Sequence, residues 1–501
     1  MVQVQSGESV MPTNSREAYR SNSWLRLLRP HRMEGALCLA VVLLGGCTVG
    51  PKYVQPTTEV PAAYKETASW KQAQPNDQNP KGKWWEVYQD ARLNALEEQV
   101  SVANQNLKAA QAIFQQARDA ARISRSSLFP SVTGGASATR TGQSQNEPLR
   151  GTSPSDYNNF TLPVDISYEA DVWGRVRRTV EAGRAEAQAS AADLATVDLS
   201  LHAELALDYF ELRGLDAQKQ LLDSTVGAYE KALDLTRSRY QGGLASAVDV
   251  AQAQTQLETT RTQAVDVEMQ RAAFEHAIAV LTGTPPSQLS LSPLALTNPP
   301  PATPPGVPSD LLERRPDVAA AERRVQAANA EIGVARAAYY PLVTIGGSGG
   351  LDSQRIGLLF QGPSGFWALG AQATQILFDA GRRHAISDQA RAAYDQSVDN
   401  YRQTVLTAFQ EVEDNVAALR ILEEEARTQD GAVKSAENSL SLSVTRYKGG
   451  VASYLEVTTA QSAALSNERS AVDILTRRMV SSVLLIKAIG GGWSVSQIPS
   501  V

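Results

Sequence analysis

Cysteine is almost absent from this chain of 501 residues, and both copies, Cys38 and Cys47, lie within the first fifty positions. The rest of the chain can therefore form no disulfide framework and no cysteine-based metal site. Histidine is also sparse, and no two of the four histidines share the spacing of metal ligands. The motifs of serine hydrolases, zinc peptidases and phosphate-binding loops are missing as well. We therefore expect no metal, no cofactor and no enzymatic activity.

Three further shortages narrow the class of protein. Aromatic residues make up only 6% of the chain, which, with abundant alanine and glutamine, is typical of long helices with thin side chains. The net charge of −6 argues against a nucleic-acid partner. No run approaches the roughly 20 apolar residues that a membrane helix needs. Any membrane crossing would have to be made by strands closed into a barrel.

The first 46 residues have the pattern of a secretory signal. Several arginines precede a short apolar run, Ala36 to Leu44, and Gly45-Gly46-Cys47 follows. Leu-Gly-Gly-Cys resembles the bacterial lipobox, which implies that Cys47 becomes the N-terminus and carries lipid. Thr48 is not the aspartate that retains lipoproteins at the inner membrane, so an outer-membrane destination is favoured. The alternative is an ordinary signal with an incidental cysteine.

Two distant stretches have nearly the same sequence. Residues 239–250 read RYQGGLASAVDV and residues 446–457 read RYKGGVASYLEV, at an offset of 207 residues. Leu212-Arg213 and Leu419-Arg420 match at the same offset. Each Gly-Gly pair lies between long proline-free segments, so we expect a helix, a turn and a returning helix. The shared order of these landmarks indicates two copies of one unit.

Each copy also changes its hydrophobic period from 3.6 to 2 after its first helix. Apolar and polar residues alternate from Phe160 to Asp171, and again from Phe366 to Phe378. Strands of about ten residues with one apolar face suit a membrane barrel. Pro163 suggests a bulge or a strand end, and Gly346 to Gly350 suggests a strand that ends in an external loop. Trp84-Trp85 is interpreted as a packing anchor at the start of one helix that continues to about residue 126.

The expected organisation divides the chain into six segments. They are a signal peptide (1–46), a lipid-anchored extended tether (47–83), a first unit (84–284), a Pro-rich linker (285–308), a second unit (309–492) and a C-terminal tail (493–501). Strands are expected at 128–140 and 159–171 in the first unit and at 340–350 and 366–378 in the second. The helical hairpins are expected to turn near residues 242 and 449.

Together these features resemble a known family. The lipobox, Trp84-Trp85, the Leu312-to-Asp317 opening of the second unit and the paired Arg-Tyr-x-Gly-Gly turns are similar to TolC-like outer-membrane factors of tripartite efflux pumps, of the lipid-anchored NodT type. The resemblance implies an α+β membrane protein. It implies a homotrimer with four strands per chain in a shared twelve-stranded β-barrel, and long antiparallel α-helices forming a periplasmic α-barrel.

Physical reasoning supports oligomerisation independently. Four strands cannot close a barrel, because about eight is the minimum, and open strand edges in lipid are not tolerated. Three copies is the family's solution, although two copies would also close. The resemblance further implies an exit duct that receives small molecules from an inner-membrane pump (RND or MFS type) through a periplasmic adaptor and releases them outside the cell.

By resemblance, the two Gly-Gly turns are the periplasmic tips, where the adaptor docks and the tunnel narrows. Glu456 stands where relatives carry an acid of the constriction, and the alternative for Arg446 and Glu456 is an ordinary ion pair at a helix end. The exposed candidates for docking and for the aperture are Arg239, Tyr240, Gly242, Gly243, Ser246, Asp249, Arg446, Tyr447, Gly449, Gly450, Ser453 and Glu456.

Two other classes compete with a channel. A lipid-anchored periplasmic coiled-coil adaptor or scaffold also has long helical hairpins, but such a protein needs no strands with a lipid-facing side. A secreted enzyme would need catalytic residues that the sequence does not offer. The transported compound cannot be predicted from these residues.

Overall fold

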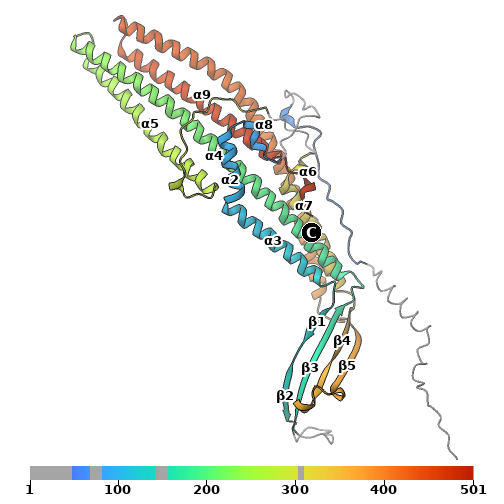
Figure 1. Cartoon of the computed structure of the whole chain (residues 1–501). Helices are drawn as coiled ribbons and strands as arrows, with labels where there is room; N and C mark the ends of the chain where they lie inside the picture. The colour runs from blue at the N-terminus through green and yellow to red at the C-terminus, as the bar shows by residue number, and fades with distance from the viewer. Residues whose placement is uncertain (1–47, 68–81, 143, 145–155, 303–309, 500–501) are drawn as a thin grey trace, which may run out of the picture.

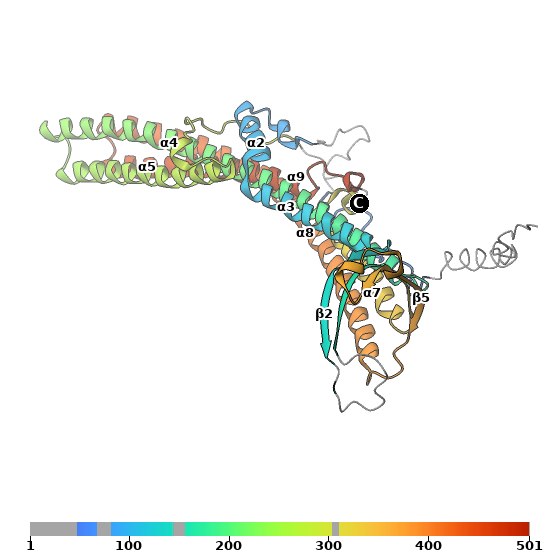
Figure 2. The ribbon, with the colours of Figure 1, turned by 60° about the horizontal axis from the view of Figure 1, so that its bottom comes forward.

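The computed structural model describes residues 48–67, 82–142, 144, 156–302 and 310–499. The predicted signal peptide and Cys47 lie outside these residues. The described chain is elongated, with long helices at one end and a single antiparallel sheet at the other (Figures 1 and 2). None of the helices among the described residues contains a stretch long and apolar enough to cross a membrane.

Four long helices form two hairpins that lie side by side (Figure 1). Helix α4 (Arg175–Gln241) turns into α5 (Ala247–Leu281), and α8 (Arg382–Lys448) turns into α9 (Tyr454–Ala488). The two outgoing helices have 67 residues each and the two returning helices have 35 each. The matching helices have equal lengths because the two sequence copies keep a constant offset of 207 residues through both hairpins.

Both outgoing helices begin with the same local chemistry. The residues before them, Gly174 and Gly381, have left-handed backbones with φ of +82° and +89°, a conformation that glycine adopts without strain. In α4 the Asp171 carboxylate accepts hydrogen bonds from the backbone amides of Val176 and Arg177, both at 2.9 Å. Asp379 holds the amide and guanidinium of Arg383 in the same way. The strand-to-helix corner is therefore encoded twice.

The first helix is interrupted, which corrects the expectation of one helix up to residue 126. Helix α2 (Ala91–Ala103) and helix α3 (Gln105–Ser126) are separated by Asn104, whose backbone is extended. The Asn104 side chain accepts from the Leu107 amide at 2.9 Å and donates to the Leu281 carbonyl at 2.8 Å. The break thus lets a buried amide cap α3 and tie it to the end of α5.

The second unit begins with α6 (Leu311–Arg314) and α7 (Pro316–Ala337), and Pro316 occupies the first helical position of α7. Proline suits that position because its missing amide hydrogen would have no partner there. The short 3-10 turns are η1 (Lys65–Thr67), η2 (Trp84–Tyr88), η3 (Pro286–Gln288), η5 (Ile356–Leu358), η6 (Gly362–Ser364) and η7 (Val495–Gln497).

The sheet has the order β1/β2-β3-β4-β5 and is antiparallel throughout. Its strands are β1 (Ser131–Gly134), β2 (Ser137–Gly142), β3 (Asp156–Glu169), β4 (Leu342–Ser353) and β5 (Gly365–Thr374). The strand expected at 128–140 is therefore two strands that begin later, and the strand expected at 366–378 stops at Thr374.

Pro163 explains the gap between β1 and β2. It lies inside β3, so the expectation of a bulge or strand end there was wrong. The pairs Gly134–Val164 and Ser137–Thr161 keep one register across the gap, and the Gly135 amide donates to the Pro163 carbonyl at 3.0 Å. Proline has no amide hydrogen to donate to a neighbouring strand, so the ladder stops locally while the alignment continues.

The sheet register gathers apolar residues on one face. Val132, Ile166 and Leu369 lie in one row across the sheet, and Val164 and Trp367 lie in the next. The opposite face carries Thr133, Asp165 and Ser348 in one row. Trp367 is 83% exposed and Leu369 is 77% exposed, so the described chain leaves this apolar face uncovered.

The glycine-rich stretch lies in the middle of β4, which corrects the expectation that the strand ends there. Gly347 stands between Ile166 and Leu369, and Gly349 stands between Val164 and Trp367. The backbones also approach closely, because a Cβ atom on Gly350 would lie 2.1 Å from the Leu162 carbonyl oxygen. The neighbouring strand therefore requires glycine at position 350, and β4 continues to Ser353.

Two connecting segments, one in the tether and one in the Pro-rich linker, pack against the long helices. In the tether, the Lys65 amide donates to the Glu413 carboxylate at 2.6 Å, and Arg420 pairs with Glu66. In the Pro-rich linker, the Leu294 amide donates to Asp216 at 2.9 Å, and Arg213 donates to the Ser292 carbonyl. The repeat-related arginines Arg213 and Arg420 thus each bind the connecting segment that packs on their own helix, the linker for Arg213 and η1 for Arg420.

Candidate functional site

The candidate site consists of the two hairpin tips, residues 239–250 between α4 and α5 and residues 446–457 between α8 and α9. The tips lie side by side at the end of the molecule farthest from the sheet (Figure 1). They contain every predicted docking or aperture residue.

Both turns have the hydrogen-bond pattern of a Schellman motif. In the first, the Leu244 amide donates to the Arg239 carbonyl at 2.7 Å and the Gly243 amide donates to the Tyr240 carbonyl at 3.0 Å. In the second, the amides of Val451 and Gly450 make the equivalent bonds, both at 3.0 Å.

The two glycines of each pair have different roles. Gly243 and Gly450 have φ of +72° and +75°, so an L side chain would strain the backbone there. Gly242 and Gly449 have φ of −81° and −75°, which any residue adopts. The sequence suggested that all four glycines permit the reversal, but the backbone requires glycine only at the second position of each pair.

The returning helices begin differently. Ser246 and Asp249 form a capping box: the Ser246 side chain accepts from the Asp249 amide at 3.1 Å, and Asp249 accepts from the Ser246 amide at 2.8 Å. In the second tip the Ser453 side chain makes no capping bond. The Glu456 carboxylate instead lies 3.8 Å from the Arg446 guanidinium, with both side chains about half exposed.

Arg239 joins the two tips within one chain. Its guanidinium carbon lies 4.7 Å from the centre of the Tyr447 ring, and its Nη1 donates to the Lys448 carbonyl at 3.0 Å. That carbonyl belongs to the last turn of α8, where the helix dipole favours a cation. Tyr447 also packs edge-on against Tyr454, with ring centres 5.3 Å apart.

This contact makes the two matching tyrosines unequal. Tyr447 is 5% exposed, so the expectation that it is exposed was wrong, whereas Tyr240 is 50% exposed. The two residues stand in matching Arg-Tyr-x-Gly-Gly motifs, but Tyr447 is covered by Arg239 and by Tyr454, whose counterpart in the first tip is Ala247.

Four exposed apolar residues at the tips escaped the sequence analysis. They are repeat-related pairs, one just after each Gly-Gly turn and one in the first turn of each returning helix. The sequence signal that could have identified them is an apolar residue at the same position in both copies of a turn, where an exposed loop would ordinarily carry polar residues. These residues are Leu244 with Val451, and Val248 with Leu455.

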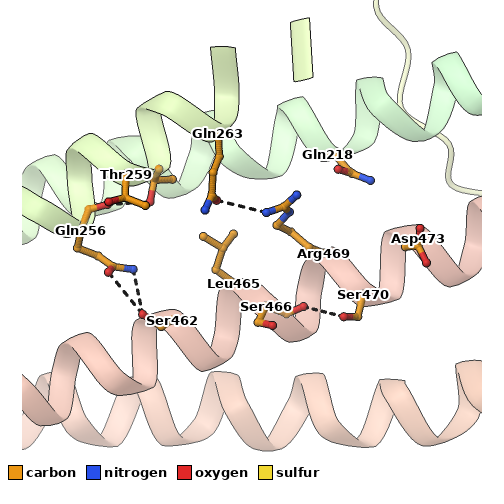
Figure 3. A pocket seen from close by; sticks show the side chains of 11 residues that line it. Gln218, Gln256, Thr259, Gln263, Ser462, Leu465, Ser466, Arg469, Ser470 and Asp473 are labelled. Carbon is orange, nitrogen blue, oxygen red and sulfur yellow. Dashed lines mark hydrogen bonds between the residues drawn. The ribbon is translucent and has the colours of Figure 1, made fainter. Parts of the chain in front are cut away.

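A polar groove of about 520 Å³ runs between α5 and α9, farther from the tips (Figure 3). Gln256 donates to the Ser462 hydroxyl at 3.2 Å, and Arg469 donates to the Gln263 side chain at 3.3 Å. Leu465 is an apolar side chain in a lining made mostly of amides and hydroxyls. These groups hold the two hairpins together, and the arrangement contains no nucleophile paired with a base.

A buried ion pair near η2 also escaped the sequence analysis, because its partners are far apart in the chain. His202 Nδ1 lies 2.6 Å from the Glu97 carboxylate, and the imidazole ring stacks on Trp85 with centres 4.4 Å apart. Burial raises the pKa of Glu97 to about 7. Burial lowers the pKa of His202, but hydrogen bonds to Asp198 and Glu97 outweigh this effect and raise it to about 9.

The Trp84-Trp85 pair fills the same region. Both side chains are buried in the largest apolar cluster, as predicted for a packing anchor. Among the residues that the structure describes, no group of three or more His, Cys, Asp or Glu side chains is arranged to hold a metal ion.

Known proteins resemble this chain over most of its length. The family described as outer membrane efflux protein matches residues 96–284 and 307–491. The toluene efflux pump outer membrane protein TtgF of Pseudomonas putida is 32% identical over 474 residues, covering 93% of this chain and 98% of the relative. The antibiotic efflux pump outer membrane protein ArpC of Pseudomonas putida is 33% identical over 470 residues, covering 91% of this chain and 95% of the relative.

A solved structure agrees with the fold. The CmeC outer membrane channel of Campylobacter jejuni is 25% identical and covers 90% of this chain and 96% of its own, with a TM-score of 0.85. The match with the family extends through both hairpins, including the two tips. The chain belongs to the outer membrane efflux protein family.

Proposed function

We propose that this protein is the outer-membrane exit duct of a tripartite efflux system and conducts small molecules passively to the exterior. The observation that carries this proposal is the sheet, which has an apolar face exposed to the surroundings and lies at the end of two long helical hairpins. The family and the relatives named above support the same function. They do not favour a periplasmic adaptor or scaffold, the competing interpretation of the long hairpins.

The duct is proposed to be a homotrimer. Strands β1/β2 and β5 are the two edges of the sheet in one chain, and unpaired strand edges in lipid are costly. Pairing β5 of one copy with β1/β2 of the next would remove every edge. Because β1 and β2 together occupy one strand position beside β3, each chain contributes four positions. Three copies would form a shared twelve-stranded barrel, and the long helices would continue it as an α-barrel in the periplasm.

The hairpin tips are proposed to meet a periplasmic adaptor that links the duct to an inner-membrane pump of RND or MFS type. The exposed apolar residues Leu244, Val248, Val451 and Leu455 suit a contact with another protein. Glu456 would bring one carboxylate per copy to the aperture. TtgF and ArpC are named for toluene and for antibiotics, so we assign no substrate to this chain.

Lipidation at Cys47 is a separate proposal, because Cys47 lies outside the described residues. Thr48, the next residue, packs against Gly174 at the junction of sheet and helices, which is where a membrane anchor would be expected. Mass spectrometry of the mature N-terminal peptide tests this proposal: a mass increase equal to an S-linked diacylglyceryl group and an amide-linked acyl chain is expected, and an unmodified cysteine would contradict it.

Conductance and mass together test the function. The detergent-purified protein is expected to have the mass of three chains and to conduct ions in a planar bilayer. A chain that stays monomeric in detergent and passes no current would contradict the proposal. Loss of drug tolerance after deletion of the gene, restored by the intact protein, would connect the channel to efflux.

A further inference from the structure

The contact between the two tips of one chain uses only half of the matching residues. Arg239, Tyr447 and the Lys448 carbonyl form the contact described above. At the 207-residue offset their counterparts are Arg446, Tyr240 and Gln241. The second tip therefore carries a matching arginine, and the first tip carries a matching tyrosine and a matching terminal carbonyl.

These counterparts do not meet within the chain. The Arg446 side chain is 58% exposed, and among the described residues its charged partner is Glu456 at the long distance of 3.8 Å. Tyr240 is 50% exposed. No cation lies over its ring in the part of the chain that the structure describes.

The packing of the helices shows which surfaces remain free. Helix α4 packs against both α5 and α9, and α9 packs against α8. The described parts of α5 and α8 form no extended contact with each other. The repeat relates α4 to α8 and α5 to α9, so the counterpart of the internal α4–α9 contact would be α8 against an α5 helix. The α5 helix of the same chain is not placed to provide it, but that of a second copy can.

The matching positions on α8 and α5 carry larger side chains than the internal contact does, so the two contacts differ in helix separation at this level. At the α4–α9 contact the backbone of Gly214 closes on Thr476, where an added Cβ would lie 2.3 Å from the Thr476 hydroxyl oxygen. The residues at the same offset are Ile421 on α8 and Met269 on α5. Both are large and apolar, and they are 53% and 67% exposed. Exposed apolar side chains at matching positions are what a contact between copies would bury.

We propose that neighbouring copies repeat the internal contact: α8 of one copy packs against α5 of the next, and Arg446 lies over the ring of the partner's Tyr240 and donates to the carbonyl of the partner's Gln241. The proposal rests on the trimer proposed above and assigns its helical interface. Arg239 and Tyr447 then meet within each chain, and Arg446 and Tyr240 meet between neighbouring chains. A trimer would contain three contacts of each kind, so six similar contacts would close the ring of tips.

Disulfide trapping tests the helical register. The double variant Ile421→Cys/Met269→Cys is expected to give covalent dimers and trimers on non-reducing gels, whereas either single variant should give none. Leu442→Cys/Met269→Cys is the matched control, because Leu442 lies 21 residues farther along α8, about 31 Å at 1.5 Å per residue. Trimers of the native protein that show no Ile421→Cys/Met269→Cys cross-link would overturn this inference alone, whereas a monomeric native protein would overturn the trimer itself.

A double-mutant cycle tests the tip contact. Arg446→Ala and Tyr240→Ala should each lower the temperature at which purified trimers dissociate. The double variant should dissociate at the same temperature as the less stable of the two single variants. Tyr240→Phe, which keeps the ring, should behave like the native protein. Additive effects of Arg446→Ala and Tyr240→Ala would overturn the pairing. So would trimers of unchanged stability that have lost binding to the periplasmic adaptor, because the two residues would then serve the adaptor.

Discussion

The second glycine of each hairpin tip carries the reversal of the chain. Gly243 and Gly450 have left-handed backbones, and no neighbouring atom lies closer than 3.8 Å to a Cβ atom added at either position. Space is therefore available for a side chain, and the constraint is the backbone conformation alone. Glycine is therefore required at these two positions by the backbone conformation and not by the packing of neighbouring atoms.

Replacing Gly243 with alanine should destabilise the first tip by about 1–2 kcal/mol, the usual cost of a left-handed backbone for an L residue. Gly242→Ala is the matched control and should be neutral or slightly stabilising, since its φ is −81°. Hydrogen exchange of the tip amides measures the effect, and roughly tenfold faster exchange is expected only in Gly243→Ala. Equal exchange in both variants would show that the turn does not depend on this φ.

The buried pair of His202 and Glu97 predicts a pH-dependent stability. Both pKa values are raised in the folded chain, so folding takes up protons and stability falls as pH rises. The contribution of His202 is fully present below its unfolded pKa of 6.5 and is lost as the pH rises through about 9. For Glu97 the loss occurs between 4.5 and about 7.

His202→Gln should therefore lower stability by about 2 kcal/mol at pH 6.5, the scale of hydrogen bonds to charged groups. It should also flatten the dependence of the melting temperature on pH between 6.5 and 9. His384→Gln is the control, because the His384 side chain is 79% exposed. An unchanged pH profile in His202→Gln would mean that the pair does not titrate in this range.

Residue-level sequence patterns identified the tips but not their exposure. Tyr240 and Tyr447 follow the same arginine and precede the same glycine pair. Tyr447 is covered by Arg239 and by Tyr454, where the first copy has Ala247, and the sequence does not show that these side chains meet. His202 and Glu97 are 105 residues apart, and sequence spacing does not indicate that they meet. In both cases the missing information is which helix lies next to which.

At the scale of elements, glycines in β4 adapt one strand to its neighbours. Gly350 faces the backbone of β3 so closely that an added Cβ would lie 2.1 Å from the Leu162 oxygen. Gly370 in β5 has no atom within 4 Å of an added Cβ. Two glycines in adjacent strands therefore differ sharply in the space around them.

Gly350→Ala should prevent β3 and β4 from pairing in the native register, because neither backbone can move without breaking ladder bonds. Folded trimers recovered from the membrane fraction should fall at least tenfold, whereas Gly370→Ala should be recovered at the native level. Heat-modifiable migration on gels measures the folded fraction. Normal recovery of Gly350→Ala would mean that the two strands separate at this point.

The sequence predicted the long helices well and the short elements less well. Helices α4 and α8 are bounded by Asp-containing corners and Gly-Gly pairs, which have direct physical consequences for the backbone. Asn104 breaks a helix through a hydrogen bond to Leu281, a partner 177 residues away. Gly346 to Gly350 were misinterpreted because glycine weakens an isolated strand, whereas in this sheet the Leu162 carbonyl leaves no space for a side chain at position 350.

At the scale of the whole molecule, the sheet separates two environments. Val132, Val164, Ile166, Trp367 and Leu369 lie on one face, and Thr133, Asp165 and Ser348 lie on the other. Within a barrel the first face would meet lipid and the second would meet water. Neighbouring residues of β3 would then tolerate the same substitution very differently.

Val164→Lys should block insertion or cost about 2–4 kcal/mol, the effect of a basic residue on the lipid face near the middle of a membrane. Asp165→Lys should insert normally and shift the ion selectivity of the pore towards anions. Membrane fractionation and reversal potentials measure the two outcomes. Equal insertion of both variants would contradict the assignment of the lipid-facing side.

The equal lengths of the two hairpins restrict how this molecule can change. Inserting one residue into α4 alone would advance its tip by about 1.5 Å and rotate it by about 100° relative to the tip of α8. Arg239 would then turn away from Tyr447, and the two tips would no longer lie level. Insertions or deletions in one outgoing helix should therefore be tolerated only when the other helix changes by the same amount, so the duct can lengthen or shorten only in matched steps.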